Sequence, residues 1–133
     1  MTDPQDYRLE EQVGFLLRRA NQRHLSIFGK AMADLTPTQF AALARLHQHG
    51  PMPQNDLGRR TAMDAATMKG VVDRLVRKGL VETSSDQKDL RRVIASLSDA
   101  GAALITAMTP VAEGITSDTL APLSRFRRRP SLE

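Results

Sequence analysis

Residues 64–81 have the sequence DAATMKGVVDRLVRKGLV. Asp64 suits the N-cap of a helix, and Gly79 suits the position just past its end. Between them, apolar residues recur at intervals of three and four positions, which is the spacing of one helical face. This pattern predicts an amphipathic helix over 64–78 whose apolar face lies in the protein core. That face comprises Met68, Val71, Val72, Leu75 and Val76.

The residues after Gly79 no longer follow a helical period. Residues 80–83 and 92–97 contain several β-branched side chains and flank a polar turn at 84–89. Two such runs joined by turn residues are typical of a β-hairpin. We therefore expect a hairpin directly after the helix.

Helical patterns lie on both sides of this region. Residues 7–34 are amphipathic until Thr36-Pro37, where Thr is a good N-cap and Pro suits the first turn of a new helix. That helix should end at Gly50-Pro51, and a short one should cover 53–60. A long helix should run from Ser98 to residue 124, with Pro110 bending it or removing a hydrogen bond. Residues 125–133 lack an apolar stripe, and we expect them to be poorly ordered.

The order of these elements predicts a mainly α fold with a small β-hairpin wing. It corresponds to a winged helix-turn-helix lobe joined to long terminal helices. The chain has 133 residues, 41% of them hydrophobic, which favours a single domain. It contains no Cys, so disulfides, thiolate catalysis and Cys-ligated zinc are excluded. No apolar run approaches the roughly 20 residues of a membrane span, and the acidic start lacks a signal-peptide core. We expect a cytoplasmic protein without membrane contact.

The net charge of +4 does not by itself indicate a nucleic-acid partner. Residues 122–133 hold four Arg and one Glu, which supply +3 of that total, so the positions of the charges matter more than their sum. Of the three His residues, His24 is isolated, and His47 and His49 face different directions near a helix end. No Gly-rich phosphate loop or acid–base pair is present. We expect no enzyme activity, no metal site and no cofactor.

The polar face of the helix at 64–78 is suited to the major groove of DNA. Small residues at its start allow close approach, Thr67 and Lys69 can reach base edges, and the arginines further along suit phosphates. The small residues are Ala65, Ala66 and Gly70, and the arginines are Arg74 and Arg77. The alternative is a winged helix used only for protein–protein assembly. Such a module should expose apolar residues on this face, whereas this sequence places Lys and Arg there.

Four motifs together give a family resemblance. They are Asp-Arg-Leu at 73–75, Gly-Leu-Val at 79–81, the hairpin sequence DQKDLRR at 86–92, and Leu-Ser-Asp-Ala-Gly at 97–101. In this combination the chain resembles the MarR family of bacterial transcriptional regulators over residues 7–121. The resemblance implies a homodimer, usually a repressor, that binds a pseudo-palindromic operator in double-stranded DNA and is released by a small ligand. It implies dimerisation helices at 7–35 and 98–124 and a DNA-binding lobe at 36–97.

The same resemblance assigns roles within the lobe. Residues 64–78 correspond to the recognition helix and 83–93 to the wing, with Lys88 and Arg91 contacting DNA. Lys88 replaces the usual Arg, so we expect a wing that is less selective for groove shape. Asp86 and Asp89 resemble an acidic pair that holds Arg91. Gln54 and Asn55, at the start of the helix over 53–60, are available for phosphates.

The segment 16–24, LLRRANQRH, is similar to that of relatives that control the degradation of aromatic acids. Arg19 and Arg23 are i, i+4 neighbours and can both point at one anion. An aromatic acid or its CoA thioester is therefore the expected effector, and His24, Phe40 and Met63 are further candidate contacts. The alternatives remain open: the arginines are solvated or bind acidic residues of a partner subunit, and the other three side chains pack in the core.

Overall fold

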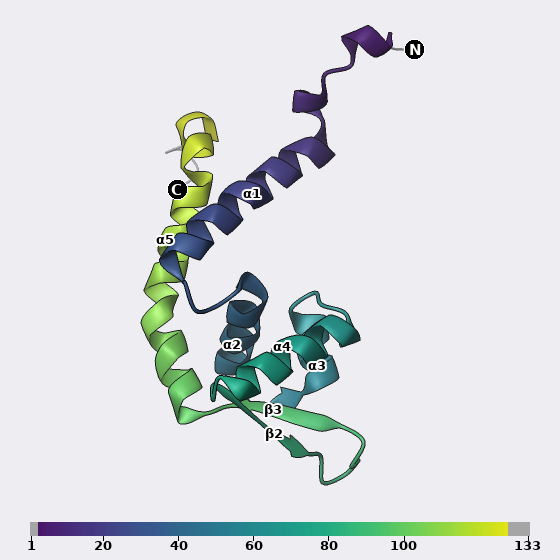
Figure 1. The fold of residues 1–133 in the computed structure, drawn as a ribbon, viewed down its shortest axis with the longest axis vertical. Coiled ribbons are helices and arrows are strands. Elements are labelled where there is room, and N and C mark those ends of the chain that lie inside the picture. The colour runs from purple at the N-terminus through teal and green to yellow at the C-terminus, as the bar shows by residue number, and fades with distance from the viewer. Residues whose placement is uncertain (1–2, 128–133) are drawn as a thin grey trace. The chain divides into compact units, whose positions relative to one another are not determined.

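The computed structural model describes residues 3–127, which form two compact units (Figure 1). One unit covers Asp34–Val111 and is called the lobe below. The other combines the residues up to Ala33 with those from Ala112 onward, and is called the terminal unit. Each is described by itself.

The lobe contains three whole helices, α2 (Pro37–His49), α3 (Gln54–Arg60) and α4 (Ala65–Arg77), and the first turns of a fourth, α5 (Asp99–Arg127). α2 begins as predicted: the hydroxyl of Thr36 accepts a hydrogen bond from the Gln39 backbone N–H, and the Gln39 side chain accepts one from Thr36 N–H. This reciprocal pair is a capping box, which satisfies two N–H groups that the helix leaves free. The helix boundaries predicted for α2, α3 and α4 agree with the structure to within one residue.

Three antiparallel strands complete the lobe, in the order β1 (Met52–Pro53), β3 (Val93–Leu97), β2 (Val81–Ser85). β2 and β3 form the predicted hairpin, with Val81 opposite Leu97 and Ser85 opposite Val93. β1 pairs with β3 through Met52 and Ala95 and was not predicted. It has only two residues, too few for an alternating pattern to emerge.

The apolar face of α4 is buried at four of the five predicted positions. Met68, Val71, Val72 and Leu75 lie in the lobe core, but Val76 is 39% exposed, so its placement in the core is wrong. At 100° per residue, Val76 lies about 80° around the helix from Met68, at the edge of the stripe. There it lines a depression between α4 and the strands.

The terminal unit contains α1 (Val13–Ala31) and the part of α5 (Asp99–Arg127) from Ala112 onward. The predicted helical start at residue 7 is wrong, because two short 3₁₀ turns, Pro4–Asp6 and Leu9–Glu11, precede α1. Tyr7 and Leu9 are more than half exposed in the chain, and most helical stability in proteins comes from packing an apolar face. The helix therefore forms only from Val13.

α5 starts as predicted, with the Ser98 hydroxyl accepting from the Gly101 N–H at 3.0 Å. Gly101 lies directly against the Leu80 carbonyl, where a Cβ would overlap it. The first turns of α5 therefore belong to the lobe, which extends past the predicted 36–97 to Val111. The helix is continuous through Pro110 and includes residues 125–127 of the tail predicted to be poorly ordered; 128–133 lie outside the described residues. Within residues 3–127, no helix is both long and apolar enough to cross a bilayer.

Candidate nucleic-acid interface and ligand cleft

The start of α4 is fixed by Asp64, whose Oδ1 accepts a hydrogen bond from the Thr67 N–H at 2.7 Å. Hydrogen bonds from the Thr67 backbone, and then from its side chain, lower the pKa of Asp64 below its ordinary value. Ala65, Ala66 and Thr67 follow on the exposed side of the first turn. Ala65 and Asp64 border a depression of about 330 Å³ that Gln54 and Asn55 of α3 also line. The residues predicted to approach DNA at the starts of α3 and α4 are thus brought together.

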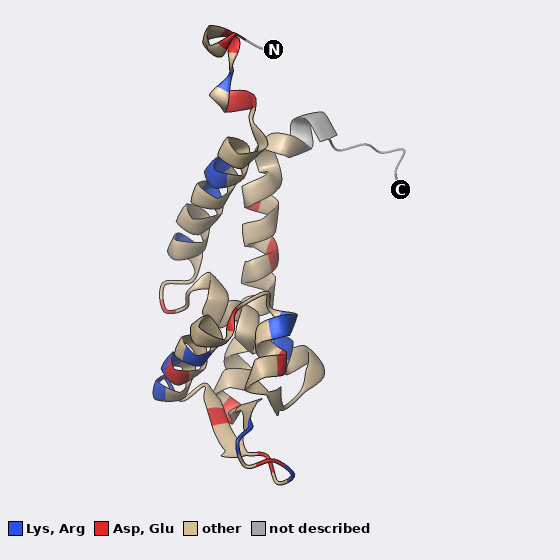
Figure 2. Cartoon of the chain, turned by 90° about the vertical axis from the view of Figure 1, so that its right-hand side faces the viewer, with Lys and Arg blue, Asp and Glu red and all other residues tan. Residues whose placement is uncertain are grey.

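The three cations of α4 are exposed but differ in their partners. Lys69 Nζ forms an ion pair with Asp73 at 3.1 Å, whereas Arg74 and Arg77 form none with the described residues. Arg74 lies back over Gly70, where an added Cβ would be 3.4 Å from its Nη1 atom. Gly70 therefore leaves room for Arg74 along the helix surface. Basic and acidic residues are interleaved over the helices of the lobe and the hairpin tip (Figure 2).

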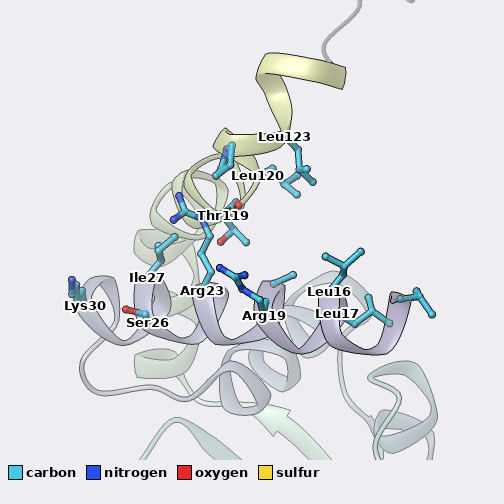
Figure 3. A pocket seen from close by; sticks show the side chains of 13 residues that line it. Leu16, Leu17, Arg19, Arg23, Ser26, Ile27, Lys30, Thr119, Leu120 and Leu123 are labelled. Carbon is cyan, nitrogen blue, oxygen red and sulfur yellow. Dashed lines mark hydrogen bonds between the residues drawn. The ribbon is translucent and has the colours of Figure 1, made fainter. Parts of the chain in front are cut away.

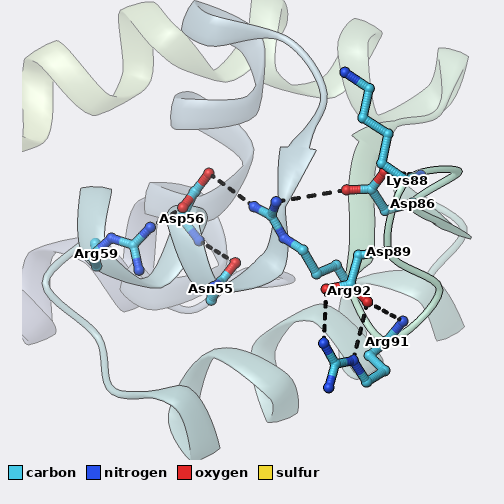
Figure 4. A network of polar contacts seen from close by, with 8 residues as sticks. All are labelled: Asn55, Asp56, Arg59, Asp86, Lys88, Asp89, Arg91 and Arg92. Atoms are coloured by element: carbon cyan, nitrogen blue, oxygen red, sulfur yellow. Dashed lines mark hydrogen bonds and ion pairs between the residues drawn. The ribbon is translucent and has the colours of Figure 1, made fainter.

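The tip of the hairpin is shaped by two carboxylates. Asp86 accepts from the Lys88 backbone N–H, and Asp89 forms an ion pair with Arg91 at 3.2 Å. The Arg91 side chain is the main cause of a lowered pKa at Asp89. Lys88 is exposed and forms no ion pair with the described residues, and its side chain extends away from the tip (Figure 4). The prediction that both carboxylates hold Arg91 is wrong for Asp86.

The partner of Asp86 is Arg92, which sequence reasoning missed. Arg92 lies 3.7 Å from Asp86 and 3.7 Å from Asp56 of α3, and Asp56 also pairs with Arg59 (Figure 4). Its Nε is buried without a hydrogen-bond partner among the described residues. Arg91 and Arg92 both lie in the turn before β3, where no regular alternation decides which side chain faces α3, so the sequence offered no clear signal for Arg92. Arg92 ties the wing to the helix that carries Gln54 and Asn55.

A cleft of about 870 Å³ lies within the terminal unit, between α1 and the C-terminal part of α5 (Figure 3). Its lining is mostly aliphatic, from residues such as Leu16, Ile27 and Leu120. Arg19, Arg23 and Lys30 add three cations, and no acidic residue lines it. An apolar cleft edged by cations is suited to an amphipathic anion.

The two arginines predicted to bind the effector are used differently. Arg23 donates to the carbonyls of Asp118 at 2.7 Å and Thr119 at 3.1 Å. Its side chain extends from α1 towards Thr119 (Figure 3). The Asp118 carbonyl would normally accept from residue 122 within the helix, but Pro122 has no N–H. Arg23 therefore supplies the missing donor. The Cζ atom of Arg19 lies 5.9 Å from the centroid of the Phe15 ring, and Arg19 also lines the cleft.

None of the other three predicted ligand contacts is among the residues that line this cleft. His24 packs against Phe28 with ring centroids 5.8 Å apart, as its packing alternative implied. Phe40 belongs to α2, and Met63 lines the depression at the start of α4. Their contact with an effector stays a prediction. Over residues 3–127, no three His, Asp or Glu side chains come together as a metal site would require.

Comparison with known proteins identifies close relatives. The family described as MarR matches residues 35–93. The chain is 44% identical to the HTH-type transcriptional repressor NicR of Pseudomonas putida, across 95% of this chain and 81% of NicR. The crystal structure of a probable transcriptional regulator from Pseudomonas aeruginosa is 53% identical with a TM-score of 0.83, over 86% of this chain and 87% of that one. The structure of Bordetella bronchiseptica BpsR, whose DNA binding is regulated by 6-hydroxynicotinic acid, is 42% identical with a TM-score of 0.81, over 86% and 83%.

Proposed function

This chain belongs to the MarR family of transcriptional regulators, and on that premise we propose that it represses transcription by binding an operator in double-stranded DNA as a homodimer. A small aromatic acid, or its CoA thioester, releases it. The family and the named repressor among its relatives support the regulatory role. The DNA contacts, the dimer and the effector are argued below from the residues.

The exposed face of α4 carries the proposal. The helix buries Met68 and Leu75 in the lobe and leaves Lys69, Arg74 and Arg77 exposed on another side. The major groove of DNA is about 12 Å wide and can admit the N-terminal end of such a helix. The side chains at the start of α4 are small, so this end can approach the bases closely. A protein-docking helix would expose an apolar face here, whereas this one exposes three cations and a single Val at its edge. Duplex DNA is therefore favoured over a protein partner.

The terminal unit supports a dimer. Six large apolar side chains of its helices are about half exposed or more in the single chain: Val13, Leu16, Leu17, Leu25, Leu120 and Leu123. Exposed apolar surface of this kind is costly in water and is typical of interfaces. Two lobes held in this way can place recognition helices in successive major grooves, roughly 34 Å apart, and exclude other proteins from a promoter. A ligand that changes the lobe separation prevents both from docking.

The effector is placed in the cleft of the terminal unit. Its aliphatic walls suit an aromatic ring, and Arg19 has no carboxylate partner among the described residues. The carboxylate of the acid would therefore pair with Arg19, while Arg23 stays bound to α5. The relative whose DNA binding responds to 6-hydroxynicotinic acid supports this ligand class.

DNA binding is tested by selecting duplexes from a random library and measuring fluorescence anisotropy over a salt series. Arg74→Ala is expected to weaken all duplexes alike and to lower the slope of log K against log salt by about 0.9 for each phosphate that the variant no longer neutralises. Lys69→Ala is expected to change sequence preference instead. A uniform loss in both variants would contradict this division of roles. Absence of any salt-dependent affinity in the wild type would contradict the proposal itself.

The effector is tested by adding benzoate, a cinnamate, 6-hydroxynicotinate or benzoyl-CoA to the protein–DNA complex. Release by at least one of them is expected, and Arg19→Ala should abolish it while DNA binding persists. The adjacent Arg18 does not line the cleft, so Arg18→Ala is the matched control. Loss of the response in Arg18→Ala, with Arg19→Ala unaffected, would place the ligand elsewhere.

A further inference from the structure

Six cations of the lobe form no ion pair with any described residue. They are Arg45, Arg60, Arg74, Arg77, Lys78 and Lys88. Three of them belong to the DNA face proposed above. Lys78 donates hydrogen bonds to the Asp34 carbonyl and to Gln39. Arg45 and Arg60 remain, and nothing in the proposed interface uses them.

These two arginines and Arg59 line a depression of about 490 Å³ between α2 and the end of α3. Arg45 is held in place there: its Nε donates to the Arg60 carbonyl at 3.0 Å and its Nη1 to Gln48 at 3.0 Å. The rest of the lining includes three alanines and no acidic residue. The depression therefore carries two arginines without an ion pair, because Arg59 is paired with Asp56, and no carboxylate lines it.

The depression adjoins the DNA face and shares Arg59 with the depression at the starts of α3 and α4. Thr61 and Ala62 line it, and they belong to the turn that leads directly to Asp64 and the first turn of α4. Ala62 adopts a φ of 58°, in the left-handed region that residues other than Gly rarely occupy. The depression beside the wing is lined by Lys69, Arg77, Thr83 and others, and it shares no residue with this one. The first surface lies against α4, β2, β3 and the start of α3, whereas the second lies against α2 and the end of α3.

We propose that Arg45 and Arg60 bind the phosphate backbone of DNA that flanks the operator core, so that each lobe contacts a longer stretch of duplex than its recognition helix and wing require. This rests on the proposed function. Guanidinium groups donate in a planar fork that matches phosphate oxygens, and the alanine floor lets a backbone approach. A DNA duplex presents one negative charge per roughly 1.7 Å, so several phosphates can lie along this surface. A small anion would contact only part of such a shallow, open depression. Contacts of this kind add affinity without adding sequence preference.

The test uses duplexes that contain the selected core sequence alone or extended at each end by roughly 5 or 10 base pairs, half a turn and one turn. The wild type is expected to bind the extended duplexes about three- to fivefold more tightly than the core. Arg60→Gln should bind the core within about twofold of wild type but lose the gain from the flanks. Its salt slope on the extended duplex should fall by about 0.9 per subunit. Arg60→Lys should restore part of both effects, since it keeps the charge.

Arg18→Gln is the matched control, because it removes one exposed arginine of α1 with the same change in net charge. An equal loss in this variant, or no gain from the flanks in the wild type, would overturn the proposal. So would an Arg60→Gln protein that retains the full gain, or one whose defect appears in binding polyglutamate rather than flanked DNA, which would indicate an acidic protein partner. If the wild type binds neither core nor extended duplex, the proposed function fails instead. Arg60 is exposed, and unchanged circular dichroism checks that the variant folds.

Discussion

Helices α4 and α1 have similar amphipathic patterns, but only α4 buries its apolar face. Met68, Val72 and Leu75 are at most 1% exposed, whereas Val13 and Leu17 of α1 are 72% and 65% exposed. The face of α4 is covered by other elements of the same lobe. On α1 Phe28 is buried near the C-terminal end, but Val13 and Leu17 have no such cover among the described residues. An apolar stripe therefore predicts that a helix packs, but it does not indicate whether the cover comes from the same chain.

The largest expected effect comes from removing the packing of α4. Leu75→Ala should lower the free energy of unfolding by about 2–5 kcal/mol, because the side chain is fully buried and a cavity remains. Urea denaturation followed by circular dichroism measures this. Leu17→Ala is the matched variant on α1 and should change the stability of the single chain by no more than roughly 0.5 kcal/mol.

The same two variants also test whether α1 and α4 differ in their contribution to dimer formation. Leu17→Ala should shift sedimentation towards the monomer at low protein concentration, and the concentration dependence that a dimer gives to the midpoint of unfolding should weaken. Leu75→Ala should leave the association constant unchanged in the folded fraction. If Leu17→Ala destabilises the monomer as much as Leu75→Ala does, α1 is packed within its own chain and the contrast is wrong.

A smaller effect is expected where the lobe fixes its wing. Arg92 bridges Asp86 and Asp56, so Arg92→Gln should free the hairpin from α3 and weaken DNA binding by about five- to tenfold, or roughly 1–1.4 kcal/mol. Faster amide exchange over 83–93 should accompany the loss. Arg91→Gln removes the more exposed neighbour and should weaken DNA binding without faster exchange. Equal exchange in both variants would argue against a positioning role for Arg92.

Sequence reasoning was most accurate where a local signal sets the structure. The caps at Thr36 and Asp64, the glycine at 79 and the hairpin each depend on residues close together in the chain. It was wrong where the outcome depends on distant contacts. The start of α1 depends on whether Tyr7 and Leu9 find a surface to pack on, and the partner of Asp86 depends on a neighbouring helix. For the candidate site, the exposure of the basic face of α4 was predicted, but Arg92 and the structural use of Arg23 were not. The DNA contacts themselves stay a prediction.

A third prediction concerns the tie between α1 and α5. Arg23→Met should destabilise the protein by roughly 1 kcal/mol, because the Asp118 carbonyl loses its donor. Pro122→Ala restores a backbone N–H at the position that should bond to this carbonyl. In the double variant the cost of Arg23→Met should therefore be smaller than in the wild-type background. Additive effects of the two substitutions in a double-mutant cycle would mean that Pro122 does not explain the Arg23 contact.

The smallest effects are expected at the helix starts, where α4 and α1 also differ. Asp64 caps α4 with a hydrogen bond to Thr67, whereas Gln12 makes no capping bond to α1. Because the folded-state pKa of Asp64 is lowered from its ordinary value of 3.8, its contribution to stability is full above that pH and is lost as pH falls through the lower folded value. Asp64→Asn keeps a cap that does not titrate. The wild type should melt above this variant at pH 7, and the difference should shrink below about pH 4.

On α1 the corresponding experiment adds a capping carboxylate instead of replacing one. Gln12→Asp places a capping carboxylate at an end that has none, and it should slow amide exchange at residues 14–16 at pH 7 but less so at pH 3. The global melting temperature should barely change, because the first turn of α1 buries little surface that unfolding would expose. A large rise in melting temperature would mean that this end of α1 is packed in the folded protein. Substitutions at the two caps thus test the same difference between a packed α4 and an exposed start of α1. They do so through backbone hydrogen bonds instead of through apolar packing.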